Sequence, residues 1–399
     1  MTRTASVSFR PAGKGLCSRT WVLDGPVDPL TLLGPGGFAW FADGFGLATA
    51  GVAARVSSVD AADVLAGIAA DDPLGLPGTG PLAVGALGFH GKGGLIVPAR
   101  IAGRTADGLS WLTEIGPADE LAEGWPVTPL PASERPDRRR WAAAVEEALA
   151  RIAGGRLSKV VLAREVTVDL RRPVDVATVV DRLRQEQPQC FTYAAGAYVG
   201  ASPELLARRR GHAVVSRPMA GTVAQGGTPD DDHRLVAAMA ASEKEQSEHR
   251  LVVGEVRARL KLLCDDVRSP AQPEVARLSM VAHLATTIRA RLRDPSVSAL
   301  DVAAVLHPTP AVAGVPEQAA LAAIAELEDF DRGLYAGPVG WVDARGDGDW
   351  AVALRSATLD GTRARLVAGA GIVAGSDPEA EWDETESKLA AMRSALTED

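Results

Sequence analysis

Two pairs of glutamates have a spacing that could place carboxylates together for metal binding. Glu245 and Glu248 lie in a segment with helical periodicity, and Glu381 and Glu384 lie in another near the C-terminus. A spacing of three residues puts both carboxylates of a pair on one helical face, where like charges repel by a few tenths of a kcal/mol. Each pair alone is typical of a solvated face. Facing each other, the two pairs would form an all-oxygen site of the kind that Mg²⁺ occupies.

Other ionisable residues lie beside apolar runs. Lys159 precedes two valines and a leucine, a pattern typical of a buried strand. A lysine buried there could act as a general base, whereas one at an exposed strand end would extend into water. Glu204 precedes two leucines, where capping of a helix N-terminus is the simplest role. His283 and His307 lie among apolar residues and are typical of hydrogen-bonded core histidines.

Length and composition place the chain among ordinary globular proteins. It has 399 residues, 46% hydrophobic and 23% charged, which excludes intrinsic disorder. The net charge is −9, with 51 acidic against 42 basic side chains, so the basic surface of a nucleic-acid binder is missing. No apolar run approaches the roughly 18 residues of a membrane span.

The cysteines and the N-terminal residues indicate a cellular location. Cys17, Cys190 and Cys264 are far apart and form neither a metal motif nor a disulfide framework, so we interpret them as free thiols in a reducing compartment. Residues 1–19 mix arginine, serine, proline and lysine without an apolar stretch. We therefore expect no secretory signal and a cytoplasmic protein.

The pattern of apolar residues changes near residue 130. Residues 1–128 contain short apolar runs bounded by glycine and proline, which are typical of sheet, and residues 129–137 indicate a connector. Helical and strand-like patterns then alternate without regular β-α-β units, which predicts an α+β fold. The expected elements are helices at 141–152, 174–185, 231–263 and 378–396, and strands at 159–164, 191–198, 350–359 and 364–368.

Several common catalytic motifs are missing. No glycine cluster ends in Gly-Lys-Ser/Thr, which excludes a P-loop, and no G-x-S-x-G elbow is present. The glycines of 369–375 have the wrong spacing for a dinucleotide site and precede an acidic helix start.

Seven ordered motifs between about Trp141 and Leu396 resemble the chorismate-utilising enzymes. This family includes isochorismate synthases, salicylate synthases, anthranilate synthase component I and aminodeoxychorismate synthase component I. The motifs are Ser158-Lys-Val-Val-Leu-Ala-Arg164, Gly200-Ala-Ser-Pro-Glu-Leu-Leu206, Arg217-Pro-Met-Ala-Gly-Thr222, Ser242-Glu-Lys-Glu-Gln-Ser-Glu-His249, Leu306-His-Pro-Thr-Pro-Ala311, Gly369-Ala-Gly-Ile-Val373 and Glu381-Trp-Asp-Glu-Thr385.

The resemblance implies both a fold and a metal site. The expected fold is α+β, with two packed antiparallel sheets surrounded by helices. Residues 1–130 would be its variable N-terminal part, and residues 138–397 its chorismate-binding catalytic region. The cofactor would be Mg²⁺, held directly by Glu248 and Glu384 and through water by Glu245 and Glu381.

The resemblance also implies a substrate site for chorismate. Lys159 would be the general base and Glu204, kept protonated by burial, the general acid. Arg355 would pair with a substrate carboxylate. The complete set of expected substrate-binding residues is Gly221, Thr222, His283, Ala311, Val312, Tyr335, Leu354, Arg355, Gly369 and Lys388.

Three positions distinguish the members of the family. Lys159 matches those that add water to the ring, and Ala220 replaces the nucleophilic lysine of aminodeoxychorismate synthases. The stretch 310–312, Pro-Ala-Val, resembles the isochorismate synthases. We therefore expect a magnesium-dependent isochorismate synthase, which is an isomerase. We expect it to be a monomer that needs no glutaminase subunit and binds neither nucleic acid nor a membrane. The alternatives are a salicylate synthase and a non-catalytic chorismate-binding paralogue.

Overall fold

The computed structural model describes residues 15–116, 125, 130, 137–225 and 228–397. The expected connector at 129–137 lies outside these ranges except for Leu130 and Asp137. Within them, no helix is long and apolar enough to cross a membrane.

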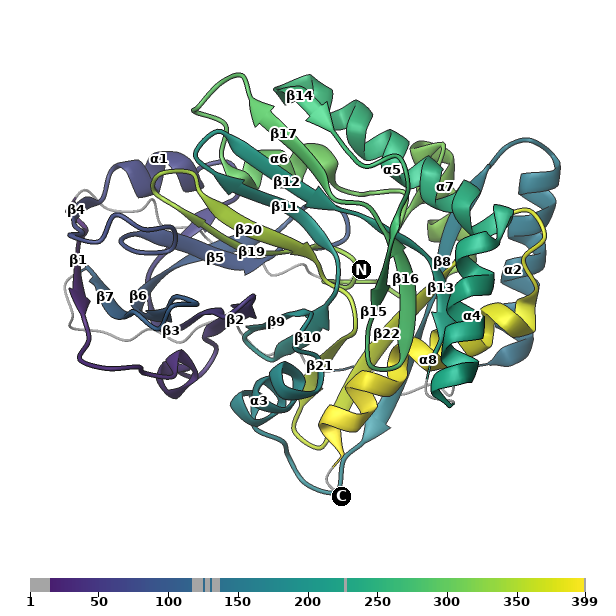
Figure 1. Cartoon of the computed structure of the whole chain (residues 1–399). Coiled ribbons are helices and arrows are strands. Elements are labelled where there is room, and N and C mark those ends of the chain that lie inside the picture. The colour runs from purple at the N-terminus through teal and green to yellow at the C-terminus, as the bar shows by residue number, and fades with distance from the viewer. Residues whose placement is uncertain (1–14, 117–124, 126–129, 131–136, 226–227, 398–399) are drawn as a thin grey trace, which may run out of the picture.

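Strands and helices alternate along the chain, with a short 3₁₀ helix near its beginning (Figure 1). The helices are η1 (Pro29–Leu32), α1 (Ala61–Ala66), α2 (Arg138–Ala153), α3 (Val176–Glu186), α4 (Pro229–Ala241), α5 (Glu243–Leu263), α6 (Ala299–Leu306), α7 (Glu317–Leu327) and α8 (Pro378–Leu396). The strands are β1 (Cys17–Val22), β2 (Phe38–Ala42), β3 (Phe45–Ser57), β4 (Ala69–Asp71), β5 (Leu82–Ala86), β6 (Gly94–Arg104), β7 (Ser110–Ile115), β8 (Lys159–Asp169), β9 (Phe191–Ala195), β10 (Tyr198–Ser202), β11 (Leu205–Arg210), β12 (Ala213–Arg217), β13 (Met219–Ala224), β14 (Cys264–Arg268), β15 (Glu274–Arg277), β16 (Val281–Ala285), β17 (Ile288–Leu292), β18 (Gly314–Val315), β19 (Pro338–Asp343), β20 (Gly348–Val352), β21 (Ser356–Asp360) and β22 (Arg363–Ile372).

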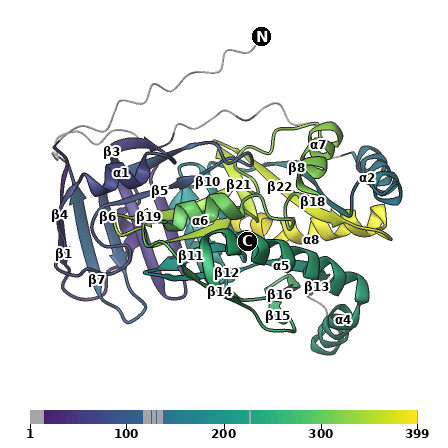
Figure 2. The same cartoon turned by 90° about the horizontal axis from the view of Figure 1, so that it is seen from above.

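The expected α+β class and the antiparallel sheets covered by helices are confirmed. In the described part of the chain, 19 strands form one continuous hydrogen-bonded network, and β13, β16 and β15 form a separate sheet of three. Strands β1 and β4 pair in parallel, whereas β8 and β22 pair antiparallel over ten residues. In Figure 2 the N-terminal strands β1, β4 and β7 lie at one end of the molecule, and α2, α7 and α8 lie at the other.

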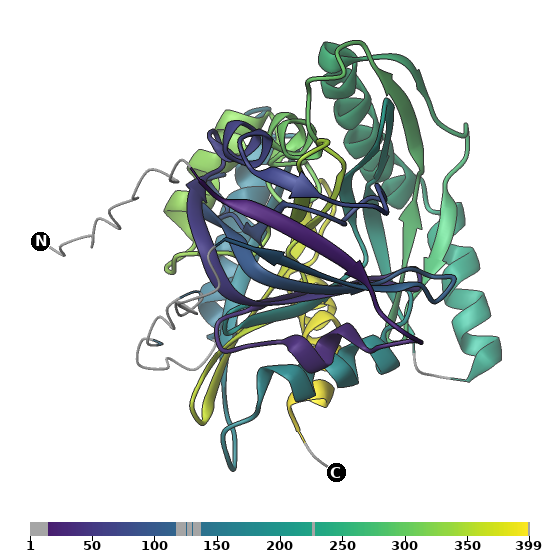
Figure 3. The ribbon, with the colours of Figure 1, turned by 90° about the vertical axis from the view of Figure 1, so that its left-hand side faces the viewer.

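The N-terminal strands are continuous with those of the C-terminal half. Strand β2 pairs with β9, and β5 pairs with β19. The main hydrophobic core also spans both parts, since it contains Trp40 and Leu82 together with Trp341 and Trp350. The purple and blue N-terminal strands face the viewer in Figure 3, with the teal and green helices and strands behind them.

Helix α8 begins and ends as the sequence predicts, and its start is fixed by local chemistry. The side chain of Asp377 caps the N-terminus by accepting from the Ala380 amide, and Pro378 occupies the first turn. The helix lies against β22, and Trp382 packs edge-on against Trp141 of α2 with 6.3 Å between ring centroids. These contacts hold the glutamates of α8 over the β8–β22 pair.

The helix expected at 231–263 is in fact two helices. Chain direction changes at Ser242, whose extended backbone ends α4 and whose hydroxyl accepts from the Glu245 amide to cap α5. The continuous-helix prediction was wrong because the extended backbone of Ser242 breaks the helix, and the serine hydroxyl then caps an amide that the break leaves without a helical partner. The break places Glu245 in the first turn of α5.

Two expected strands are also interrupted. The stretch 191–198 forms the end of a hairpin, with Gly196 at φ 61° between β9 and β10. The stretch 350–359 divides at residues 353–355 into β20 and β21. In the neighbouring strands, Pro203 and Glu204 separate β10 from β11, so Glu204 does not cap a helix as its sequence context suggested.

Candidate active site

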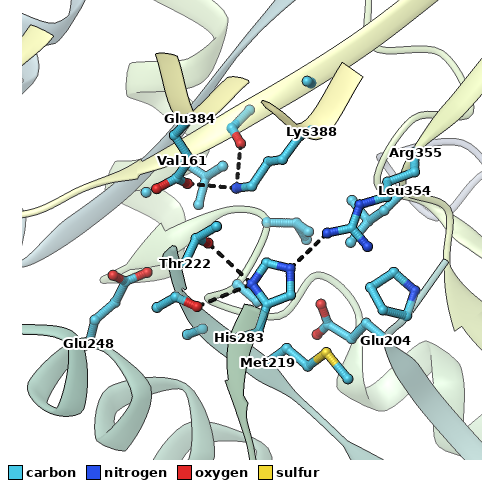
Figure 4. Close-up of a pocket in the computed structure, with 18 of the residues that line it drawn as sticks. Val161, Glu204, Met219, Thr222, Glu248, His283, Leu354, Arg355, Glu384 and Lys388 are labelled. Carbon is cyan, nitrogen blue, oxygen red and sulfur yellow. Dashed lines mark hydrogen bonds and ion pairs between the residues drawn. The ribbon is translucent and has the colours of Figure 1, made fainter. Parts of the chain in front are cut away.

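One pocket gathers all sixteen candidate site residues, which come from segments far apart in the sequence. Figure 4 shows how several of them, among them Glu204, His283 and Arg355, lie in this pocket. It encloses about 860 Å³, including the open space at its mouth. One wall is made by β8, β22 and α8, and the opposite wall by β13, β16 and the start of α5. The link between β20 and β21 closes one side.

Lys159 is buried at the beginning of β8 and faces α5. Its Nζ lies 2.8 Å from Oε1 of Glu248, and the lysine side chain is only 1% exposed. A lysine extending from a strand end into water is therefore excluded. The ion pair joins the two walls of the pocket and balances the charge of the buried ammonium.

A second lysine pairs with a glutamate of its own helix, α8. Lys388 Nζ lies 2.7 Å from Oε1 of Glu384, one turn away on α8, and donates to the carbonyl of Gly369 at 2.9 Å. Burial alone would lower the pKa of Lys388, but the Glu384 carboxylate outweighs it and raises that pKa. Lys388 is therefore a fixed positive charge beside β22.

The four glutamates line the same pocket from two helices. Glu245 and Glu248 come from the first turns of α5, and Glu381 and Glu384 from the first turns of α8. Among the described residues no three His, Cys, Asp or Glu side chains already form a compact metal cluster. An all-carboxylate donor set suits Mg²⁺, which keeps several waters and does not need a closed protein cage. The residues therefore fit this ion.

Glu204 is an acid held in its neutral form. It is 3% exposed in the gap between β10 and β11. Burial raises its pKa to about 8, although the nearby charges of Lys159, Lys388 and Arg355 oppose this rise. Its backbone is tied on both sides, because its amide donates to Ser202 Oγ and its carbonyl accepts from the Val352 amide.

Arg355 enters the pocket from the interrupted strand. Its φ of 48° lies in the left-handed region, which costs a non-glycine residue about 1–3 kcal/mol. Nη2 lies 2.7 Å from Nε2 of His283. Nη1 is buried and has no hydrogen-bond partner among the described residues, so it is a donor suited to an incoming carboxylate.

The protonation of His283 follows from its partners. Burial and the charge of Arg355 hold its pKa well below the usual range, so the ring is neutral. Nδ1 lies 3.1 Å from the carbonyl of Gly221, which can only accept, so Nδ1 carries the proton. Nε2 is then the acceptor for Arg355. His283 thus orients the guanidinium, with Thr222 Oγ1 also 3.2 Å from Nδ1.

A bulge at Gly221 makes this arrangement possible. The register of β13 against β16 shifts between Ala220 and Thr222, and Gly221 has φ 77°. A side chain there would be strained, and its Cβ would lie 2.9 Å from Oε2 of Glu245.

The apolar wall is positioned by one buried arginine. Arg332 donates to the carbonyls of Val312 and Val161, both at 2.8 Å, and so joins the segment of Ala311 and Val312 to β8. Tyr335 and Leu354 line the pocket as well, and burial raises the pKa of the Tyr335 hydroxyl.

The pocket also contains residues that were not predicted as part of the site. Most are direct neighbours of predicted ones, or lie two residues away on the same strand face, a signal that alternation along a strand could have supplied. They are Val161, Pro203, Met219, Ala220, Val367, Ala368 and Gly371.

Comparison with known proteins identifies the family. A family model described as chorismate binding enzyme matches residues 117–397. The chain belongs to this family. A Mycobacterium tuberculosis protein with the provisional name isochorismate synthase MenF is 41% identical over 340 residues, covering 80% of this chain and 87% of that protein.

Two further relatives agree with this assignment. Isochorismate synthase DhbC of Bacillus subtilis is 41% identical over 263 residues, covering 63% of this chain and 66% of the relative. The solved structure of MenF, the menaquinone-specific isochorismate synthase from Escherichia coli, matches with a TM-score of 0.81 at 30% identity. That match covers 98% of this chain and 97% of the MenF chain.

Replacing Gly371 by alanine tests the close packing around the Lys159–Glu248 pair. The new Cβ would lie 2.8 Å from Oε1 of Glu248 and 3.1 Å from Cε of Lys159. We expect a loss of about 1–3 kcal/mol in the free energy of unfolding, the usual cost of overpacking, measured by urea denaturation. The control is Gly254→Ala on α5, where the space is open, and it should stabilise by about 0.5–1 kcal/mol. Equal stability of Gly371→Ala and wild type would contradict the packing.

Proposed function

We propose that the protein is an isochorismate synthase, which converts chorismate reversibly to isochorismate. The observation that carries this proposal is a buried lysine and a buried, protonated glutamate in one pocket. A reaction that takes a proton from water and gives one to a leaving hydroxyl needs two such groups at neutral pH. The similarity to isochorismate synthases supports the same assignment.

The two groups have separate roles in the proposed reaction. Lys159 acts as the base, and its amine takes a proton from a water whose oxygen bonds to ring carbon C2. The ring double bond shifts, and the C4 hydroxyl leaves as water with the proton of Glu204. One water enters and one leaves, so the reaction is an isomerisation without oxidation or reduction. Reversal of both proton transfers gives the back reaction.

The remaining site residues would bind the two carboxylates of chorismate. Arg355, oriented by His283, offers its free Nη1 to one of them. Glu248 and Glu384 would hold Mg²⁺ directly, and Glu245 and Glu381 through water. When bound, the ion supplies positive charge that anchors and neutralises the other carboxylate. Gly221, Thr222, Gly369 and Lys388 would complete the contacts with the substrate.

Electrostatic balance supports a divalent cation in this pocket. Before substrate binds, Lys159, Lys388 and Arg355 bring three formal positive charges, and the four glutamates of α5 and α8 bring four formal negative ones. Glu204 and His283 are neutral. A dianionic substrate would therefore meet a slightly negative pocket unless a divalent cation reverses its sign.

We further propose the setting of the enzyme. It would act in the cytoplasm as a monomer without a glutaminase subunit. Residues 138–397 would form the catalytic region, with residues 1–130 as a variable part of the same fold.

Product analysis tests the proposed function. Purified protein incubated with chorismate and Mg²⁺ should give a mixture of chorismate and isochorismate, separated by chromatography. The wall of Ala311, Val312, Tyr335 and Leu354 should release isochorismate before its enolpyruvyl group is lost. Pyruvate, measured with lactate dehydrogenase and NADH, should not accumulate.

Other product patterns would contradict this proposal. Salicylate and pyruvate formed as fast as chorismate disappears would indicate a salicylate synthase, and binding without turnover a non-catalytic paralogue. As the control, Lys159→Ala should lower the rate by about 10²–10⁴-fold and leave chorismate binding largely intact.

The state of Glu204 predicts the alkaline limb of the pH profile. Its proton is present below its pKa of about 8 and is lost above it, so kcat/KM should fall as pH rises through about 8. Glu204→Gln should reduce the rate by about 10²–10⁴-fold and abolish this limb in the residual activity. The same limb in Glu204→Gln would assign the acid to another residue.

Metal removal tests the roles of the glutamates. EDTA should abolish turnover and added Mg²⁺ should restore it, because the carboxylates otherwise repel an anionic substrate. Glu248→Gln and Glu384→Gln should raise the Mg²⁺ concentration for half-maximal activity more than Glu245→Gln does. Calorimetric titration with Mg²⁺ gives the same order without turnover. Full activity in metal-free buffer would exclude a role for the metal. A larger effect of Glu245→Gln than of Glu248→Gln and Glu384→Gln would show that Glu245 binds the ion directly and that the other two act through water.

A further inference from the structure

Arg355 lies where two neighbouring strands are interrupted together. Strands β20 and β21 are separated by residues 353–355, and their partners β11 and β10 are separated by Pro203 and Glu204. At this point the left-handed backbone of Arg355 is outside any regular hydrogen-bonded ladder. Such a conformation persists only where surrounding contacts determine it.

Tyr193 supplies such a contact from the next strand. It lies on β9, is fully buried and does not line the pocket. Its hydroxyl donates to the carbonyl of Leu354 at 3.2 Å, on the peptide that leads into Arg355. Burial raises the pKa of the Tyr193 hydroxyl well above its usual value, so it stays protonated and able to donate.

The packing around this hydrogen bond leaves no spare room. Gly200 of β10 pairs with Tyr193, and a Cβ on Gly200 would lie 2.3 Å from the tyrosine hydroxyl oxygen and 3.1 Å from the carbonyl oxygen of Arg355. That carbonyl also accepts from the Ala201 amide at 3.2 Å. The backbone of Arg355 is therefore held on both sides of its Cα.

We propose that Tyr193 is a positioning residue for Arg355, which fixes the left-handed turn that directs the guanidinium to the substrate carboxylate. The proposal rests on the proposed function for the identity of that carboxylate. His283 fixes the guanidinium of Arg355, and Tyr193 fixes the peptide that precedes this residue. With both ends fixed, Nη1 is presented in one direction before substrate arrives, which reduces the entropy lost on binding.

A neighbouring tyrosine provides a matched control. Tyr198 of β10 is also buried, with its ring centroid 5.9 Å from that of Tyr193. Its hydroxyl donates to Ser356 Oγ at 2.7 Å, and so contacts a side chain instead of the backbone of the turn. The Tyr198 hydroxyl also interacts with that of Tyr193, but Tyr198→Phe leaves the Tyr193 hydroxyl in place to donate to the Leu354 carbonyl.

Steady-state kinetics with chorismate separate positioning from general stabilisation. Tyr193→Phe should raise KM about 3- to 10-fold, the range for loss of one buried hydrogen bond, with kcat within about twofold. Tyr198→Phe should leave both constants within about twofold, although the two variants lose similar thermal stability. Equal KM values for the two variants would overturn the proposal.

A double-mutant cycle identifies the residue through which Tyr193 acts. In an Arg355→Lys background, Tyr193→Phe should cause no further rise in KM, because the guanidinium that it positions is already gone. A further rise of the same size would show that Tyr193 acts on the site in another way.

Crystal structures of the two phenylalanine variants test the inference without any activity. We expect the backbone of Arg355 to leave the left-handed region, or its guanidinium to move away from His283, in Tyr193→Phe and not in Tyr198→Phe. An unchanged Arg355 in Tyr193→Phe would overturn the positioning role even if the wild-type protein does not convert chorismate. Failure of wild-type turnover with a displaced Arg355 would instead overturn the proposed function alone.

Discussion

The ion pair between Lys159 and Glu248 is the interaction on which the arrangement of the pocket depends. It connects the first residue of β8, in the large strand network, to α5, which packs on the separate three-stranded sheet. A buried pair of charges contributes little net stability, because desolvation offsets most of the attraction. The pair therefore matters for where it places its two groups. Gly371 allows the approach, since any side chain there would occupy the space that the pair needs.

The same pocket separates groups by protonation state. Burial keeps Glu204 and His283 neutral, whereas Lys388 is held charged by the carboxylate of Glu384. A carboxyl with a pKa of about 8 is still protonated at neutral pH and can give a proton that a surface glutamate would already have lost. The neutral ring of His283 can accept a hydrogen bond from Arg355 only because its own proton lies on the other nitrogen. Burial thus produces an acid at one position and a hydrogen-bond acceptor at another.

Sequence patterns predicted three of the four expected helices, and the residues that the family resemblance implied for the site line one pocket. The patterns failed where chain breaks depend on tertiary contacts. The spacing of Glu381 and Glu384 placed both on one face of α8, but nothing in it showed that they line the same pocket as the α5 glutamates. The break at Ser242 had a local signal, since a serine three residues before Glu245 is a capping pattern. The break before Arg355 had none. Residues 353–355 contain no glycine or proline, so the strand pattern continues through them in the sequence.

That unpredicted break explains how a sheet can present ionisable side chains to a pocket at its interior. In a continuous antiparallel ladder, alternate residues point to opposite faces and neighbouring strands leave no room for a ligand. The gap between β10 and β11 and the gap between β20 and β21 lie side by side, and each removes ladder hydrogen bonds. Some of the freed backbone groups bond to each other instead, as the Val352 amide does with the Glu204 carbonyl. Glu204 comes from one interruption and Arg355 from the other. The proposed acid and the proposed carboxylate-binding donor therefore share one origin, a paired gap whose shape is fixed by the strands on either side.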